Sequence, residues 1–85
     1  MIETEHGVFE LIKDYREAFE VGKFNARYVD HFNQYEFIVG DLSADMLRLK
    51  GFHKKDVESI PDYLMESATP NGPYFVMRRV IKPVK

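Results

Sequence analysis

The order in which apolar residues recur along the chain is the strongest constraint on its fold. In four stretches they recur at every second position, as in strands, and in two others they recur every three or four positions, as in amphipathic helices. The strand-like stretches are residues 7–17, 35–41, 46–52 and 73–81, and the helical stretches are 22–33 and 59–68. The predicted order is therefore strand, helix, strand, strand, helix, strand.

Each predicted helix presents one apolar stripe. In the first, Phe24, Tyr28 and Phe32 follow one another at every fourth position. In the second, Pro61 falls in the first turn, where a residue without an N–H leaves no hydrogen bond unmade. The stripe of the second helix consists of Ile60, Tyr63, Leu64 and Ala68.

The second and third strands predict an antiparallel hairpin whose loop is residues 41–45. In this hairpin Leu47 and Leu49 point toward the core, and Arg48 and Lys50 lie on the opposite face of the sheet. The last strand is apolar on both faces, which is typical of a strand in the interior of a sheet. Its apolar residues are Phe75, Met77 and Ile81 on one face, and Tyr74, Val76 and Val80 on the other.

This order of elements is that of the ferredoxin-like βαββαβ arrangement, a four-stranded, mainly antiparallel sheet with two helices on one face. The alternative is a helix-on-sheet domain with another strand order, because the ferredoxin-like order places the first and third strands at the centre rather than the last. The chain has 85 residues, 45% of them hydrophobic, and predicts a single α+β domain over residues 1–85.

Composition and the first residues indicate the compartment. The chain contains no cysteine, which excludes disulfides and thiolate chemistry and is typical of a reducing compartment. The first ten residues are acidic, unlike a signal peptide, and no apolar stretch approaches the roughly 20 residues needed to cross a bilayer. We therefore expect a cytoplasmic protein without a membrane partner.

Charged residues are distributed unevenly along the chain. Residues 1–47 carry ten acidic and four basic side chains, whereas residues 48–85 carry four acidic and eight basic ones. Such asymmetry is one mark of a site for a polyanion. Alternatively, the two parts interleave in the fold and their charges pair across strands.

Four segments share a specific spacing: RYVDHFNQYEFIVGD, LRLKGF, DYLMES and YFVMRR. In these segments the chain resembles the YutD-like family of small bacterial proteins, over roughly residues 9–79. The family is known chiefly as a domain of unknown function, sometimes labelled a transcriptional regulator, so the resemblance implies a regulatory or accessory role. The matching positions are Arg27, Tyr28, Tyr35, Ile38, Val39, Gly40, Asp41, Leu47, Arg48, Leu49, Lys50, Gly51, Phe52, Tyr63, Leu64, Tyr74, Phe75 and Val76.

The chain departs from the family pattern at three positions. Leu42 stands where the family carries a Trp, and Ala68 and Gly72 stand where two Cys are common. A thiol or metal role of that loop therefore does not transfer to this chain, and neither does an aromatic contact by the hairpin turn.

Catalytic and metal-binding patterns are absent from the sequence. The three histidines, His6, His31 and His53, lack the short spacing of paired metal ligands. Asp41 and Asp45 flank the predicted turn, where aspartate commonly hydrogen-bonds backbone amides, so a structural role is favoured over a carboxylate pair. No phosphate loop, dinucleotide fingerprint or nucleophile elbow is present. We therefore expect no catalytic residue, cofactor, metal or small-molecule substrate.

Basic and aromatic residues follow two of the predicted strands. If these strands are neighbours, their outward side chains form a cationic stripe with rings beside it, which suits phosphates and unstacked bases. Alternatively, Phe52 and Tyr74 complete the core and the basic residues keep a sheet edge soluble. The candidate partner-binding residues are Arg48, Lys50, Phe52, Lys54 and Lys55, with His53 among them, and Tyr74, Arg78 and Arg79, followed by Lys82.

These observations predict a non-enzymatic regulatory or accessory domain that binds a macromolecular partner, with nucleic acid on the basic and aromatic face as one candidate. The alternative is a protein–protein interaction module that uses a sheet edge or face and binds no nucleic acid.

Overall fold

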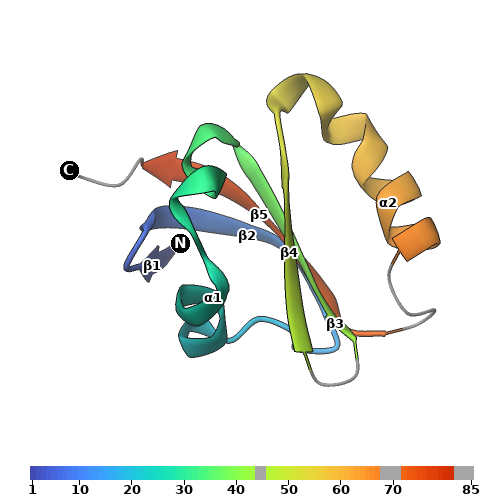
Figure 1. Ribbon diagram of the computed structural model, residues 1–85, viewed down its shortest axis with the longest axis horizontal. Helices are drawn as coiled ribbons and strands as arrows, with labels where there is room; N and C mark the ends of the chain where they lie inside the picture. The colour runs from blue at the N-terminus through green and yellow to red at the C-terminus, as the bar shows by residue number, and fades with distance from the viewer. Residues whose placement is uncertain (44–45, 68–71, 82–85) are drawn as a thin grey trace.

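The computed structural model describes residues 1–43, 46–67 and 72–81. It contains one five-stranded antiparallel sheet with helices against it (Figure 1). The strands are β1 (Ile2–Thr4), β2 (Gly7–Tyr15), β3 (Phe37–Ser43), β4 (Met46–Phe52) and β5 (Tyr74–Ile81). The helical elements are α1 (Val21–Arg27), α2 (Ile60–Ser67) and two 3₁₀ helices, η1 (Asp30–Gln34) and η2 (Lys54–Ser59).

The strand order is β1-β2-β5-β3-β4, with every neighbouring pair antiparallel. The predicted ferredoxin-like order is therefore wrong, because β4, the third predicted strand, lies at an edge and β5 lies at the centre. The interior position predicted for β5 is confirmed. Phe75 and Met77 pack on one face of this strand and Val76 packs on the other, so burial on both sides holds it between two partners.

The sheet has five strands rather than the predicted four, because β1 pairs with the start of β2. The two strands join through a tight turn at which Gly7 has a φ of 120°, a conformation that favours glycine. The side chain of Thr4 holds this turn, since its hydroxyl donates to the Gly7 carbonyl and accepts from the His6 N–H. With only three residues, β1 gives little periodic signal in the sequence.

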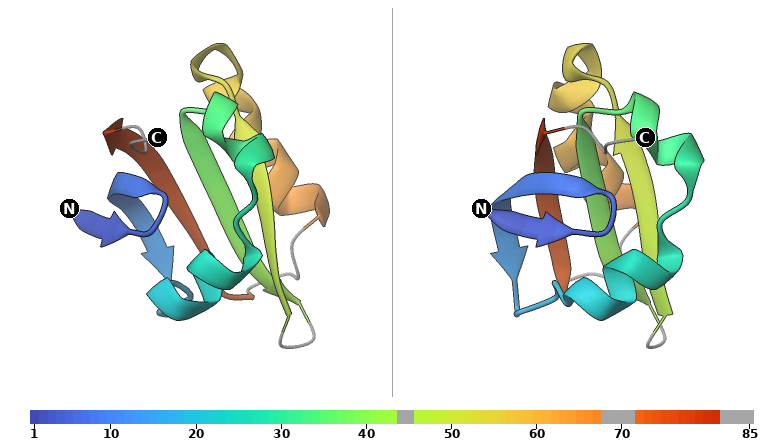
Figure 2. Two further views of the ribbon diagram at one scale, coloured as in Figure 1. Left: turned by 60° about the vertical axis from the view of Figure 1, so that its left-hand side comes forward. Right: turned by 90° about the vertical axis from the view of Figure 1, so that its left-hand side faces the viewer.

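The two helices lie on opposite faces of the sheet (Figure 2). Phe24 and Tyr28 from the α1 side pack in one cluster, and Ile60 of α2 packs in the other. The prediction of both helices on one face is therefore wrong. The reason lies in β3, where Phe37 and Ile38 are consecutive, both buried, and point to opposite clusters, so each face requires a cover.

The first predicted helix is shorter than its apolar pattern suggests. Residues 22–33 were expected to form about three turns, but α1 ends at Arg27, and Tyr28 and Val29 are extended before η1 begins. All three stripe residues, Phe24, Tyr28 and Phe32, still belong to the same core, so the stripe is confirmed although the helix is broken. In the second helix, Ile60, Tyr63 and Leu64 pack on the sheet as predicted, and Ala68 lies outside the described residues.

Within the described ranges, no helix combines the length and the apolar character that a membrane crossing requires.

Candidate functional site

The candidate partner-binding residues do not form one continuous stripe. The residues of β4 and those of β5 are separated by β3, which pairs with both strands. The adjacency on which the predicted stripe depended is therefore wrong. Phe52 is buried against α2, with its ring 5.7 Å from the ring of Tyr63, and Tyr74 is partly buried and stacks on Tyr15 at 5.3 Å. These two aromatic residues complete the core, as the alternative interpretation expected.

Arg48 is paired across the hairpin with Asp41. Its Nη2 donates a hydrogen bond of 2.6 Å to Asp41 Oδ2, and the two residues are directly opposite in the β3–β4 register. Asp41 is completely buried within β3, so the prediction that it caps a turn is wrong, because β3 continues to Ser43. The hydrogen bond to Asp41 and its negative charge raise the pKa of the Arg48 guanidinium. Asp45, the second carboxylate considered, lies outside the described residues.

Arg78 is likewise paired with an acidic residue from the first part of the chain. Its Nη2 and Nε donate to Glu10 Oε1 at 2.8 and 3.1 Å, and the two residues are opposite each other in the β2–β5 register. Together with the Arg48 pair, this contact confirms that the acidic and basic parts of the chain interleave and that charges pair across strands.

Arg79 is buried, with 6% of its surface exposed. Its guanidinium donates to the backbone carbonyls of Tyr35, His6 and Phe32 and to the hydroxyl of Tyr28, and it lies 4.8 Å from the centre of the Phe9 ring. All four acceptors are neutral, and Arg79 forms no ion pair with any carboxylate in the described part of the chain. The side chain therefore connects η1 and the β1–β2 turn to β5, with a charge that only neutral dipoles and rings compensate.

Three of the predicted basic residues remain exposed. Lys50 is near the end of β4, and Lys54 and Lys55 begin η2. None of the three forms an ion pair with a residue in ranges 1–43, 46–67 and 72–81. Lys82 lies outside those ranges. Of the predicted cationic stripe, the described residues thus retain only a small exposed group at one end of β4, formed by Lys50, Lys54 and Lys55.

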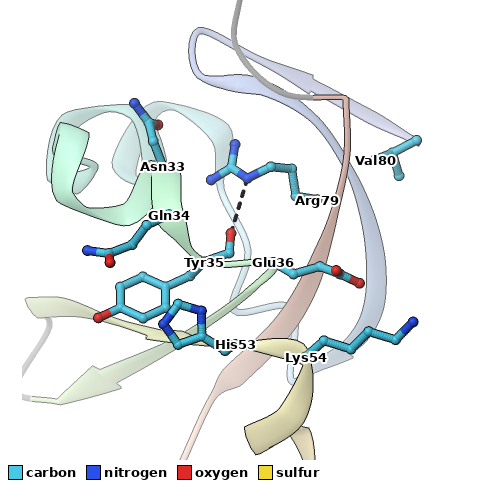
Figure 3. A pocket seen from close by; sticks show the side chains of 8 residues that line it. All are labelled: Asn33, Gln34, Tyr35, Glu36, His53, Lys54, Arg79 and Val80. Atoms are coloured by element: carbon cyan, nitrogen blue, oxygen red, sulfur yellow. Dashed lines mark hydrogen bonds between the residues drawn. The ribbon is translucent and has the colours of Figure 1, made fainter.

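A pocket of about 370 Å³ opens beside this group, between η1 and the end of β5 (Figure 3). Arg79 lies at the back of the pocket, and its Nε donates a hydrogen bond of 3.2 Å to the Tyr35 carbonyl. Lys54 lies at the rim of the pocket. The pocket is lined by Asn33, Gln34, Tyr35, Glu36, His53, Lys54, Arg79 and Val80. Polar and charged side chains therefore dominate its walls.

The rings of Tyr35 and His53 separate this pocket from a second hollow of about 320 Å³. Their centres are 4.6 Å apart. The second hollow reaches Lys50 and Gly51 on β4 and Asp56 and Ser59 on η2; the ring of Tyr35 lies so close over Gly51 that a Cβ there would overlap it. The second hollow therefore lies at the end of β4, and the first lies at Arg79, with Tyr35 and His53 lining both.

The sequence identified only His53, Lys54 and Arg79 of the main pocket as binding candidates. Asn33, Gln34 and Glu36 were not predicted. Asn33 was expected on the polar face of the helix over 22–33 and Glu36 in the strand over 35–41, whereas η1 and the turn into β3 bring both to the pocket with Gln34. One available signal is Gly51, an isolated glycine inside a strand, which often marks the close approach of another group. That group is Tyr35, at the border of the pocket.

Comparisons with known proteins agree in sequence and in fold. A profile of the family described as "Putative antitoxin YutD-like" matches residues 3–78. The protein "Putative antitoxin YutD" of Bacillus subtilis (strain 168) is 33% identical over 91 residues, covering 96% of this chain and 100% of the relative. The solution NMR structure of protein yutD from B. subtilis has a TM-score of 0.74 at 33% identity, covering 91% of this chain and 78% of that chain.

Proposed function

This chain belongs to the family described as "Putative antitoxin YutD-like", and from that premise we propose that it is a non-catalytic regulatory domain that acts by binding another protein. An antitoxin acts by counteracting a toxin, and a small domain does so most simply through a stable contact. The protein-interaction alternative is preferred here to nucleic acid because three of the candidate basic residues are already engaged: Arg48 and Arg78 by carboxylates, and Arg79 by the core.

The observation that carries the proposal is the outer edge of β4. This seven-residue strand pairs with β3 on one side and with no described strand on the other. The opposite edge of the sheet is formed by the three residues of β1 and, beyond them, by residues 10–15 of β2, where Glu10, Lys13 and Asp14 are exposed charged residues. A long open edge offers backbone donors and acceptors to a strand of another protein, the recognition mode called β-augmentation.

Side chains along β4 suit such a contact. Met46, at the start of the strand, is 53% exposed and supplies apolar surface. Lys50, near its end, is exposed and forms no ion pair with a described residue. Because lysine on an edge strand discourages pairing between identical copies, this edge favours a partner whose strand carries an acidic residue opposite Lys50.

Affinity capture of the tagged protein from its own lysate tests this proposal. We expect a protein partner that persists after nuclease treatment and is lost with Lys50→Glu or Met46→Glu. Lys13→Glu is the matched control, since Lys13 is an exposed lysine on β2, at the other side of the sheet from β4. A partner that disappears on nuclease treatment, or capture unaffected by both β4 substitutions, would contradict the proposal.

Nucleic acid remains the second candidate because of one observation. Lys50 and Lys54, neither of them paired with a described carboxylate, line the two hollows that share the rings of Tyr35 and His53. If this group binds nucleic acid, affinity for a single-stranded oligonucleotide falls steeply with added salt, because bound counterions are released. A protein contact along β4 responds far less.

A further inference from the structure

We propose that the pocket between η1 and β5 binds a phosphate group. The starting point is the charge of Arg79. Burying an ion normally requires an opposite charge beside it, because taking a charge out of water costs several kcal/mol. Arg79 is 6% exposed and has no carboxylate partner in the described ranges, so its positive potential extends into the space that it borders.

The lining of the pocket carries an excess of positive charge. The lining includes two cationic side chains, Arg79 and Lys54, and one carboxylate, Glu36. Lys54 forms no ion pair with Glu36 or with any other described acid. An anion placed between the buried guanidinium and the exposed ammonium would therefore interact favourably with both.

The remaining polar groups suit a phosphate better than a carboxylate. Asn33 carries a side-chain amide and His53 carries a ring N–H, and both residues line the pocket, from η1 and from the loop after β4. The amide of Gln34 is already engaged, since its Nε2 donates to the His31 carbonyl at 3.1 Å. A tetrahedral phosphate presents acceptor oxygens in several directions at once, whereas a planar carboxylate presents two. A volume of about 370 Å³ also leaves room for more than a carboxylate.

The phosphate has two possible sources, free inorganic phosphate or a nucleotide. In the nucleotide case the base would lie against the exposed ring of His53, at the border with the second hollow. This inference goes beyond the proposed protein contact and does not depend on it, because the pocket is lined by η1, the loop after β4 and β5, not by the open edge of β4.

NMR titration of the ¹⁵N-labelled protein with inorganic phosphate, and separately with AMP and acetate, tests the inference. We expect saturable shifts of the side-chain amide of Asn33 and of the backbone amide of Lys54. Lys54→Gln is expected to weaken binding about tenfold, and Glu36→Gln to strengthen it about threefold, because the two substitutions change the lining charge in opposite directions.

Lys55→Gln is the matched control, since Lys55 is the next residue of η2, equally charged and exposed, and does not line the pocket. Its affinity for phosphate should equal that of the unaltered protein. AMP binding more tightly than phosphate would identify a nucleotide, and equal affinity would identify free phosphate.

Three results would overturn the inference. They are the absence of saturable shifts at these residues up to about 20 mM phosphate, equal weakening by Lys54→Gln and Lys55→Gln, and acetate binding as tightly as phosphate. Arg79 is not the residue to substitute first, because its loss removes hydrogen bonds that the fold uses.

Discussion

Arg79 Nη2 donates a hydrogen bond of 2.5 Å to the hydroxyl oxygen of Tyr28, which in turn donates to Asn33 Oδ1 at 2.6 Å. The contact joins the central strand to the residue that directly follows α1. The ring of Tyr28 also stacks on the ring of His6, with 4.2 Å between their centres, so the β1–β2 turn contacts Tyr28 as well. One buried guanidinium thus fixes three segments that are distant in sequence and shapes the back of the pocket.

We expect Arg79→Met to lower the free energy of unfolding by about 3 kcal/mol, because several buried acceptors lose their donor. Tyr28→Phe removes one of these acceptors and also the hydrogen bond to Asn33, so it should cost about 2 kcal/mol. Urea unfolding of both variants and of the double variant checks this. The double variant should lose less than the sum of the single losses, since they share an interaction. Strictly additive losses would mean that the hydrogen bond contributes little.

Gly40→Ala should lower the free energy of unfolding by about 3 kcal/mol, because the new methyl group would overlap the ring of Phe75 in a fully packed core. Gly51→Ala is the comparison. There the overlapped ring is that of Tyr35, which is only partly buried and free to shift, so a loss of about 1 kcal/mol is expected. Thermal or urea unfolding measures both, and equal losses would contradict the packing argument.

The Asp41–Arg48 pair predicts a contrast with the Glu10–Arg78 pair. Asp41 is completely buried, so Arg48→Met leaves a carboxylate without its counter-charge and should clearly lower the urea midpoint. Arg78→Met breaks a pair in which both partners are exposed and should change the midpoint little.

Adding Asp41→Asn to Arg48→Met should restore part of the lost stability, since the stranded charge is then removed. A double variant less stable than Arg48→Met alone would show that the carboxylate is needed for some other reason.

Tyr63 predicts a loss of stability at alkaline pH. Burial raises the pKa of its phenol above the ordinary value near 10, the negative charge of Asp41 raises it further, and Arg48 opposes the shift. The unfolded chain therefore releases this proton at a lower pH than the folded chain does. The stabilising contribution is complete below about pH 10 and is lost as the pH rises through the folded value.

Urea midpoints between about pH 9 and pH 11 measure the effect. Tyr63→Phe, which cannot ionise, should show a shallower decline than the unaltered protein over the same range. Parallel declines would assign the alkaline loss to other groups.

Much of the fold could be predicted from periodicity, and the family from segment spacing. The strand at residues 73–81 was recognised as interior because Phe75 and Val76 are adjacent and both apolar, and the resemblance to the YutD-like family is confirmed. Strand order could not be predicted. The pattern of apolar residues along a strand indicates which side chains face the core, but not which strands pair with it. For the same reason, the apolar pattern did not indicate which face of the sheet α2 covers.

The candidate site was harder to predict than the fold. The sequence does not distinguish the environments of its arginines. Arg48 pairs with a buried carboxylate, Arg78 pairs with an exposed carboxylate, and Arg79 donates to neutral acceptors. Which group each arginine contacts depends on residues of other strands, and therefore on the register of strand pairing. The pocket also depends on where α1 ends, which the apolar stripe through Tyr28 concealed because it continues across the break.

The position of β5 has a consequence for how the chain folds during synthesis. β2 and the β3–β4 hairpin have no contact in the sheet until β5 enters between them, although β5 is the last of the described strands to leave the ribosome. Until then each half exposes a strand edge and an uncovered apolar face. Assembly is therefore a late, long-range event, and the half-built sheet is the stage at which a nascent chain is most open to mispairing or to a chaperone.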